Sequence, residues 1–454
     1  MPTLGGELPL REGTWHLHVR PAGEQTLVPL LITQTRYPEL PMWTAGGHKE
    51  FAVGMTPEQH ATIVARRDLA ADERGGFNQR RLRDSVYVPS RSGALRDTVV
   101  YSSFDGRQYS CNPRAIHEEL VHREAPLEHL WVVRDGMCRV PPTAGVLRRG
   151  SRGYYEAFAR ARFVVTNDHL PDWFERRADQ ICVQTWHGTP LKLLGRDLLE
   201  VRPGIGRAIE RWRRQARNWQ YVLSSNPHST ATLQRAYELN GEMLETGYPR
   251  DDFLAGAARE EATQRLRERL GIAPGVRVVL YAPTFREHVR DSRGRFRLNL
   301  QIDLDRLREA VGSETVVLIR KHHRVAEVIA GAGNGFVRDV SSYPDGTELL
   351  LAADVLVTDY SSLMFDFANT GRPMIFFTYD LDAFRDQVRG LYLDLGVEAP
   401  GPLAHTTDEL AAALNDIESI RADYAERYRK FAGTYCALDD GGAAARVVDR
   451  LFSW

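Results

Sequence analysis

The sequence predicts an α/β protein in which two Rossmann-like domains face a cleft, preceded by a small β-rich N-terminal segment. From about residue 98 onward, short apolar runs alternate with amphipathic stretches. Continuous apolar runs of this length are typical of parallel strands that are buried on both faces and connected by helices. A break rich in Gly and Pro near residue 272 divides the runs into two successive sets, which indicates two domains.

The chain length agrees with this organisation. At 454 residues, 43% of them hydrophobic, the chain is too long for one ordinary domain. We expect a β-rich segment of unassigned role at 1–97, an N-terminal Rossmann-like domain at 98–271, a C-terminal Rossmann-like domain at 272–430 and a C-terminal helix at 431–454.

The strands are expected in a definite order. In the first segment Trp15, Leu17 and Val19 alternate with polar residues, which is typical of a half-buried strand. The later strands are the runs DTVVYSS, EHLWVV, ARFVVTN, ICVQTW and QYVLSS, and after the break VRVVLYAPT, ETVVLIRKH, DVLVTDYSS and PMIFFTYD. Ligands of such sheets bind beyond the carboxyl ends of the strands, so polar residues that follow these runs are candidate site residues.

Composition excludes several classes of protein. The formal net charge is −1, so no overall charge favours nucleic acid, and we expect none as a partner. The four cysteines lie far apart without a CxxC pair, which argues against a zinc site or a disulfide framework and fits a reducing compartment. The N-terminus lacks the pattern of a signal peptide, and no apolar run reaches the length of about 18 residues that a membrane span needs.

The first candidate motif is QTWHGTPLK, which follows an apolar strand. His187 lies on a turn shaped by Gly188 and Pro190, and Thr189 and Lys192 lie beside it. A histidine that points into the cleft from this turn can accept a proton from a hydroxyl at neutral pH. The alternative is a histidine that only satisfies a loop carbonyl.

The second motif is LIRKHHRV, at the end of another strand. Arg320, Lys321, His322, His323 and Arg324 are five potential cations on one loop, and they repel one another unless an anion binds there. A pyrophosphate or phosphodiester would fill this role, whereas the alternative is a solvated basic loop. Neighbouring side chains point in different directions, so we expect only one of the two histidines to face the ligand.

The third motif is VLVTDYSSLMFDFANTGRP. A strand ends at Thr358, a turn follows, and a helix then runs to about Asn369. Ser361 or Ser362 is a suitable N-cap, and the free N–H groups of the helix start can bind an anion. The alternative is ordinary capping without a ligand.

Arg286 of LYAPTFRE follows a further strand and could hold a phosphate. Two DxD strings, at 303–305 and 380–382, are of the type found in metal-dependent sugar-nucleotide sites. We discount both because they lie in helical, surface-like patterns rather than at strand ends. The fingerprints of dinucleotide-binding, P-loop, HExxH and GxSxG proteins do not occur in the sequence.

The residue pattern of the segment 202–219 is that of a basic amphipathic helix. Its apolar residues recur at helical spacing and its other face is dense in arginine; the arginines are Arg207, Arg211, Arg214 and Arg217. Such a helix can lie in an anionic membrane interface. The alternative is a helix that packs its Ile and Trp stripe on the sheet and exposes its arginines to solvent.

Taken together, QTWHGTPLK, YAPTFR, RKHH and TDYSSLMFDFANTGRP resemble the CDP-glycerol glycerophosphotransferase family, the group of teichoic acid primases and polymerases. The likeness covers roughly residues 98–450, with the motifs in the family's order. The resemblance implies a GT-B-like fold of two Rossmann-like domains around a cleft. It also implies that His187 deprotonates the acceptor hydroxyl and that His322 contacts the donor pyrophosphate, with His323 as the competing residue.

The resemblance places Asp359, Ser361 and Ser362 at the donor phosphates. The remaining candidates for this role are Arg286, Arg320, Lys321, His323 and Thr358, and the candidates for the acceptor side or cleft are Gly188, Thr189 and Lys192.

The implied reaction moves a polyol phosphate from CDP-glycerol or CDP-ribitol to a hydroxyl of a lipid-linked or polymeric acceptor and releases CMP. We expect no cofactor and no fixed metal site, with loosely bound Mg²⁺ left open. The expected location is cytoplasmic, peripheral at the inner face of the cell membrane. The competing hypotheses are a GT-B glycosyltransferase that uses a nucleotide sugar and a non-catalytic polymer-binding module. The sequence does not decide between glycerol and ribitol as the transferred polyol, or between a primase and a polymerase.

Overall fold

The computed structural model describes most of the chain in two compact units. The described residues are 2–3, 6–7, 12–22, 27–46, 49–65, 69–134, 138–256, 259–286, 289, 300–322, 325, 329 and 335–452. The first unit comprises residues 1–109 and 128–162, and the second comprises 110–127 and 163–454. All the candidate site residues lie in the second unit.

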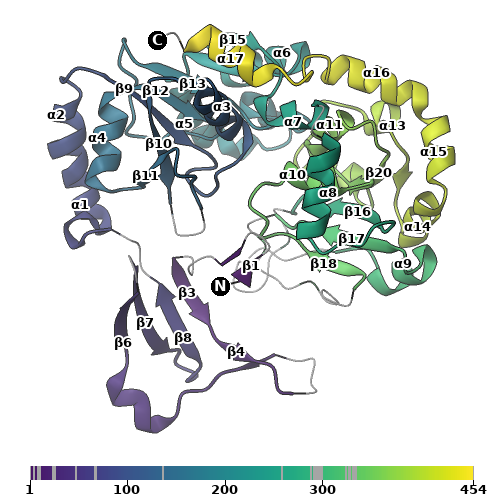
Figure 1. The fold of residues 1–454 in the computed structure, drawn as a ribbon, viewed down its shortest axis with the longest axis horizontal. Coiled ribbons are helices and arrows are strands. Elements are labelled where there is room, and N and C mark those ends of the chain that lie inside the picture. Colours follow the sequence, from purple (N-terminus) through teal and green to yellow (C-terminus); the bar gives the residue numbers. More distant parts are fainter. Residues whose placement is uncertain are drawn as a thin grey trace. The chain divides into compact units, whose positions relative to one another are not determined.

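The first unit contains a four-stranded antiparallel sheet in the order β3-β8-β7-β6 (Figure 1). Its strands are β3 (Gly13–His16), β6 (Met42–Gly46), β7 (Lys49–Met55) and β8 (Ala61–Ala65). This confirms a β-rich start. The segment 75–90 is helical, however, comprising α1 (Gly75–Leu82), a π-helical turn at Arg83–Tyr87 and α2 (Val88–Ser90).

The first unit also contains parallel strands in the order β11-β10-β9 and the helix α4 (Arg152–Arg160). The strands are β9 (Arg96–Ser102), β10 (Glu128–Val133) and β11 (Gly145–Arg148). The apolar residues of β9 and β10 are buried; Val99, Val100 and Trp131, for example, have no exposed surface.

The second unit contains two sets of parallel strands. In the first, the order is β12-β13-β14-β15, with bounds β12 (Ala161–Thr166), β13 (Ile181–Gln184), β14 (Tyr221–Ser224) and β15 (Glu242–Glu245). The helices of this part are α3 (Cys111–His122), α5 (Gly206–Ala216), α6 (Pro227–Tyr237) and α7 (Asp252–Ala255). Near the C-terminus, α17 (Ala443–Leu451) returns to pack against α3.

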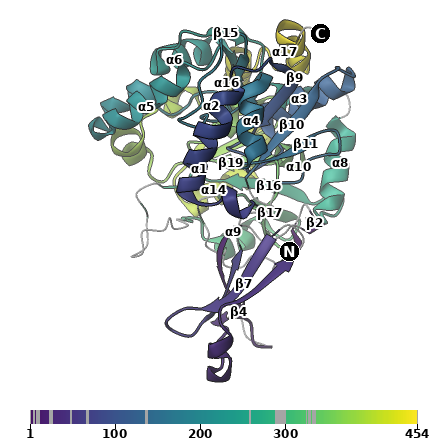
Figure 2. The same ribbon diagram turned by 90° about the vertical axis from the view of Figure 1, so that its left-hand side faces the viewer.

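The second set forms a six-stranded parallel sheet in the order β18-β17-β16-β19-β20-β21. Its strands are β16 (Arg277–Ala282), β17 (Thr315–Ile319), β18 (Val337–Asp339), β19 (Val355–Thr358), β20 (Met374–Phe377) and β21 (Leu403–Ala404). Helices α8 (Arg259–Arg269) and α10 (Glu348–Ala352) pack together beside this sheet, as both views show (Figure 1, Figure 2).

The other face of the six-stranded sheet packs against α9 (Leu304–Val311) and α14 (Thr407–Asn415). Val279, Val317 and Val357 of the strands meet Leu307 and Leu410 of these helices in one core cluster. Burial on both faces explains why β17, β19 and β20 are apolar without alternation. The remaining long helix, α16 (Ala425–Tyr435), packs against α11 (Leu363–Ala368).

All nine apolar runs predicted after residue 97 contain strands. The prediction missed β11, β15, β18 and β21, each of which pairs with a single neighbouring strand. Among the residues that the structure describes, no helix has both the length and the apolar character needed to cross a membrane.

Candidate active site

His187 lies on the turn that follows β13, next to the end of the neighbouring strand β12. Its Nδ1 is 2.6 Å from the carbonyl oxygen of Asn167. A carbonyl only accepts hydrogen bonds, so Nδ1 carries the proton, and Nε2 of the neutral ring keeps a lone pair. The ring stacks on Trp186, with 5.0 Å between the ring centroids. Burial lowers the pKa of His187, and the nearby Asp168 opposes this effect, so the ring is neutral at neutral pH.

Gly188 brings this turn against the third motif. Its φ is +144°, and a Cβ atom at this position would lie 2.8 Å from Ser362 Oγ and 3.2 Å from Nη2 of Arg250. Only glycine fits such a close approach without displacement. Thr189 turns inward, where its hydroxyl lies 2.9 Å from Ser225 Oγ, and its side chain is buried. The position of Thr189 therefore indicates a role in holding the turn.

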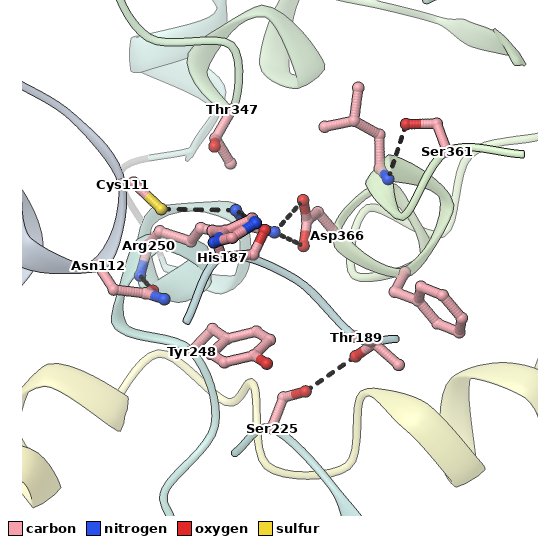
Figure 3. Close-up of polar contacts among 12 residues, drawn as sticks. Cys111, Asn112, His187, Thr189, Ser225, Tyr248, Arg250, Thr347, Ser361 and Asp366 are labelled. Atoms are coloured by element: carbon pink, nitrogen blue, oxygen red, sulfur yellow. Dashed lines mark hydrogen bonds and ion pairs between the residues drawn. The ribbon is translucent and has the colours of Figure 1, made fainter. Parts of the chain in front are cut away.

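Arg250, which the sequence reasoning missed, fixes the same turn (Figure 3). Its Nη1 donates to the carbonyl oxygen of His187 at 2.8 Å, and its Nη2 lies 2.7 and 2.6 Å from the two carboxylate oxygens of Asp366. The side chains of Arg250 and Asp366 are 7% and 1% exposed. The backbone N–H of Arg250 donates to Asn112 Oδ1, and Nδ2 of Asn112 donates to the carbonyl of Trp186.

These contacts join the two halves of the second unit. Asp366 lies on α11, directly after the TDYSS turn, whereas Arg250 follows β15. The only sequence signal for this ion pair was a carboxylate within the apolar helix LMFDFA and an arginine after the turn GYP. Neither pattern predicts which residue the side chain contacts.

The second motif is arranged differently from the expectation of five mutually repelling cations. Lys321 forms an ion pair with Asp339 at 2.8 Å, and Arg320 donates to the carbonyl oxygen of Tyr343 at 2.9 Å. Two of the five cations therefore have partners within the protein, so mutual repulsion does not by itself require a bound anion, and anion binding by this loop stays a prediction. His322 stacks on Phe285, with 4.2 Å between ring centroids. His323 and Arg324 lie outside the described residues.

In the third motif, the carboxylate of Asp359 is committed to an internal network. It pairs with Nη1 of Arg286 at 2.8 Å, and Nε of Arg286 is 2.7 Å from Asp380. Tyr360 also donates its hydroxyl to Asp380 at 2.9 Å. Arg286 is 2% exposed, so this geometry favours a role in holding the loop over direct phosphate binding. Of the DxD string at 380–382, Asp380 is thus part of this network, whereas Asp382 is 87% exposed on the short helix α12 (Leu381–Ala383).

The hydroxyls of the third motif also have defined positions. Thr358 is fully buried and donates to the carbonyl oxygen of Ala282 at 2.9 Å. Ser362 occupies the N-cap of α11 but makes no side-chain capping bond, whereas Ser361 Oγ accepts from the backbone N–H of Leu363 at 3.3 Å. Of the two serines, Ser361 therefore supplies the local hydrogen bond.

A cleft of about 640 Å³ brings three of the predicted residues together: His187, Lys192 and His322. The further lining residues are Asp168, His169, Trp186, Leu194, Gly195, Leu198, Arg202, Ile205, Ala208, Trp212, Tyr237, Thr284, Phe285, Phe384, Val388 and Arg389. The other predicted residues that the structure describes do not line this cleft. Asp168 and His169 follow the predicted strand ARFVVTN, so the strand-end rule could have identified them.

The segment 202–219 contributes α5 to this cleft. Ile205, Ala208 and Trp212 line it, and Trp219 is buried. The four arginines Arg207, Arg211, Arg214 and Arg217 are exposed. The apolar stripe therefore faces inward and the arginines are exposed to solvent, as the alternative to a membrane-embedded helix predicts. Only the arginine face could contact a membrane surface.

Two parallel sheets of Rossmann-like α/β type place this chain in the class of GT-B-like enzymes. The model of the family described as CDP-glycerol:poly(glycerophosphate) glycerophosphotransferase matches residues 88–453. The chain belongs to this family.

Curated relatives and solved structures agree with this family membership. The chain is 40% identical over 373 residues to the teichoic acid poly(glycerol phosphate) polymerase of Bacillus subtilis, covering 80% of this chain and 50% of the relative. It is 36% identical over 366 residues to the teichoic acid glycerol-phosphate transferase of Staphylococcus aureus, covering 79% of this chain and 93% of the relative. The solved structure of the wall teichoic acid polymerase TagF matches with a TM-score of 0.76 and 32% identity, over 82% of this chain and 92% of that chain. The chain thus spans about half the length of the Bacillus subtilis relative.

Proposed function

We propose that this chain transfers a polyol phosphate from a CDP-alditol to a hydroxyl group of a teichoic-acid-like acceptor and releases CMP. Family membership and the activities named for the relatives support this class of reaction. The observation that carries it in the site is the contact between Nδ1 of His187 and the carbonyl oxygen of Asn167. The Nδ1 bond to Asn167 leaves Nε2 as a base in a cleft that also holds His322.

The reaction balances with the groups of this cleft. The acceptor oxygen attacks the β-phosphorus of the donor, a new P–O bond forms, and the bond from this phosphorus to the oxygen bridging it to CMP breaks. Nε2 of His187 takes the hydroxyl proton. His322, on the opposite half, is placed to stabilise charge on the diphosphate, and CMP carries the electron pair away.

The donor is proposed to be CDP-glycerol first and CDP-ribitol second, because the family description and both relatives named above specify glycerol phosphate. The test is CMP release with each donor offered separately, together with a synthetic polyol phosphate acceptor. A new phosphodiester in the ³¹P NMR spectrum of the product supports the proposal. Turnover of a nucleotide sugar instead indicates a glycosyltransferase, and tight polymer binding without turnover indicates a binding module.

We also propose peripheral association with the inner face of the cell membrane through the arginine face of α5. The support is the exposure of Arg207, Arg211, Arg214 and Arg217 on one helix. Because the apolar stripe faces inward, the attraction would be electrostatic and weakened by salt. Flotation with anionic liposomes tests it: the triple change of Arg211, Arg214 and Arg217 to Glu should abolish binding, and unchanged flotation refutes this contact.

We propose that the transfer uses no cofactor, which stays a prediction. Among the described residues, no group of three or more His, Cys, Asp or Glu side chains is close enough to hold a metal ion. Dependence on Mg²⁺ is a separate question, and turnover in the presence of EDTA and after Mg²⁺ addition answers it.

A further inference from the structure

Gln184, the last residue of β13, is a buried polar residue at the end of an apolar strand. Its side chain has no exposed surface, like those of Cys182 and Val183 before it. A buried amide is unfavourable unless its donor and its acceptor are both hydrogen-bonded. Here Nε2 of Gln184 donates to the carbonyl oxygen of Asp168 at 3.1 Å, and Oε1 accepts from the backbone N–H of Trp186 at 2.9 Å. Because a carbonyl only accepts and an N–H only donates, these partners fix the orientation of the amide.

The two hydrogen bonds join the loops on either side of the proposed base. Asp168 directly follows Asn167, whose carbonyl oxygen is 2.6 Å from Nδ1 of His187. Trp186 directly precedes His187 in the chain. Each hydrogen bond of the Gln184 amide is thus one residue away from one partner of the Nδ1 contact. One buried side chain therefore sets the spacing between the imidazole and the carbonyl oxygen that it contacts.

Trp186 is held in a conformation that tryptophan seldom adopts. Its φ is +53°, in the left-handed region that favours glycine. Its N–H donates to Gln184, and its carbonyl oxygen accepts from Nδ2 of Asn112 at 3.2 Å. Such a conformation persists only where surrounding contacts enforce it. Loss of the Gln184 contact removes one of these restraints from the peptide unit that precedes His187.

We propose that Gln184 is a positioning residue that determines which nitrogen of His187 carries the proton. Its effect on catalysis rests on the proposed function. While Nδ1 donates to Asn167, Nε2 presents its lone pair and is able to accept the proton of the attacking hydroxyl. If the loops move apart, the carbonyl no longer selects Nδ1, and both neutral tautomers become populated. In the second tautomer Nε2 already carries a proton, so that fraction of the enzyme lacks the base.

The test variant is Gln184→Met, which keeps the length of the side chain and removes both hydrogen bonds. Long-range ¹H–¹⁵N NMR of protein labelled with ¹⁵N-histidine shows which nitrogen of His187 is protonated, and His187→Ala assigns the signals. The wild type should show Nδ1–H alone, and Gln184→Met should show both tautomers. In the CMP-release assay kcat should fall about tenfold, because a displaced base loses both its tautomer and its alignment. KM for the donor should change less than about twofold.

Gln79→Met is the matched control. The amide of Gln79 also donates to two backbone carbonyl oxygens, those of Glu73 and Gly150, each at 2.7 Å. Gln79 lies on α1 in the first unit and does not line the cleft. The control should lose thermal stability as the test variant does, but its His187 spectrum and its kcat should equal those of the wild type.

Gln184→Glu serves if the methionine variant does not fold. A carboxylate still accepts from the N–H of Trp186 but does not donate to the carbonyl of Asp168, so both tautomers should again appear. A folded variant at Gln184 that retains Nδ1–H alone overturns the inference, as does wild-type kcat in that variant.

The spectrum does not depend on turnover, so this inference and the proposed function fail separately. Mixed tautomers in Gln184→Met, with a wild-type protein that releases no CMP, support the positioning of His187 and refute the transfer reaction. Turnover by the wild type, together with an unchanged spectrum and kcat in Gln184→Met, supports the reaction and refutes the role of Gln184.

Discussion

Arg250 and Asp366 form a buried ion pair in which one guanidinium nitrogen lies 2.7 and 2.6 Å from the two carboxylate oxygens. The same guanidinium donates to the carbonyl oxygen of His187. The pair thus links the turn that carries the proposed base to the helix that follows the TDYSS motif. The proposed catalysis uses His187 on one half and His322 on the other, and this pair would help to hold the two halves together.

Breaking this pair should be costly. Asp366→Asn leaves the buried Arg250 without its counter-charge, so we expect a loss of about 3–5 kcal/mol in the free energy of unfolding. Chemical denaturation measures it. The control is Arg265→Gln, which breaks the ion pair with Glu261 between side chains that are 62% and 71% exposed. That change should cost less than about 1 kcal/mol. Equal effects of the two substitutions contradict this interpretation.

Removal of either cleft histidine should abolish most activity without unfolding the protein. We expect His187→Ala and His322→Ala each to reduce kcat by a factor on the order of 10²–10³. CMP release measures activity and circular dichroism measures folding. His122→Ala, at the exposed end of α3, is the control and should retain activity. Near-native turnover by a folded His187→Ala protein rules out His187 as the base.

The acid limb of the pH–rate profile should lie below the ordinary histidine pKa of 6.5, because burial lowers the pKa of His187. The base acts when it is deprotonated, so activity falls as pH falls through this lowered pKa. Arg250 lowers the pKa of His187 further, while the Asp168 carboxylate raises it. Asp168→Asn should therefore move the limb to still lower pH. Movement to higher pH, measured as kcat/KM with saturating donor, contradicts the assignment.

Gly188→Ala should impair both folding and activity. The new methyl group would lie 2.8 Å from Ser362 Oγ, at a backbone φ of +144° that alanine adopts poorly. We expect a destabilisation of about 1–3 kcal/mol and a lower kcat. The double variant with Ser362→Gly removes the contact with Ser362 and should recover some stability. A double variant no more stable than Gly188→Ala, by thermal unfolding, shows that the contact with Ser362 is not the cause of the loss.

A buried carboxyl group should make stability depend on pH. Burial raises the pKa of Asp439 to about 7, against an ordinary value of 3.8. The folded state then binds more protons than the unfolded state between these values, so stability is greatest at low pH and falls as pH rises toward 7. Asp439→Asn should flatten this slope and stabilise the protein at pH 8. Denaturation at several pH values measures it, and an unchanged slope excludes Asp439 as the cause.

The strands that could be predicted and those that could not differ in one physical property. The recognised runs of the six-stranded sheet, such as VRVVLYAPT for β16, are buried on both faces and are therefore continuously apolar. The missed strands β11, β15, β18 and β21 each pair with one neighbour only. The sequence EMLE of β15 illustrates the reason, since both glutamates are exposed and only Leu244 is buried.

The sequence by itself determined the fold class and the family, and it identified two histidines that line one cleft, because strand ends and family motifs are local patterns. The tertiary structure alone decided which residues support them. Arg250 is 63 residues from His187 and 116 from Asp366 in the chain, so no local pattern predicts their contact. Likewise, Arg286 and Lys321 were candidates for phosphate binding because they follow predicted strands. In the structure, carboxylates from other parts of the chain neutralise both side chains. A sequence shows which side chains are charged, whereas the tertiary packing decides which opposite charge lies next to each of them.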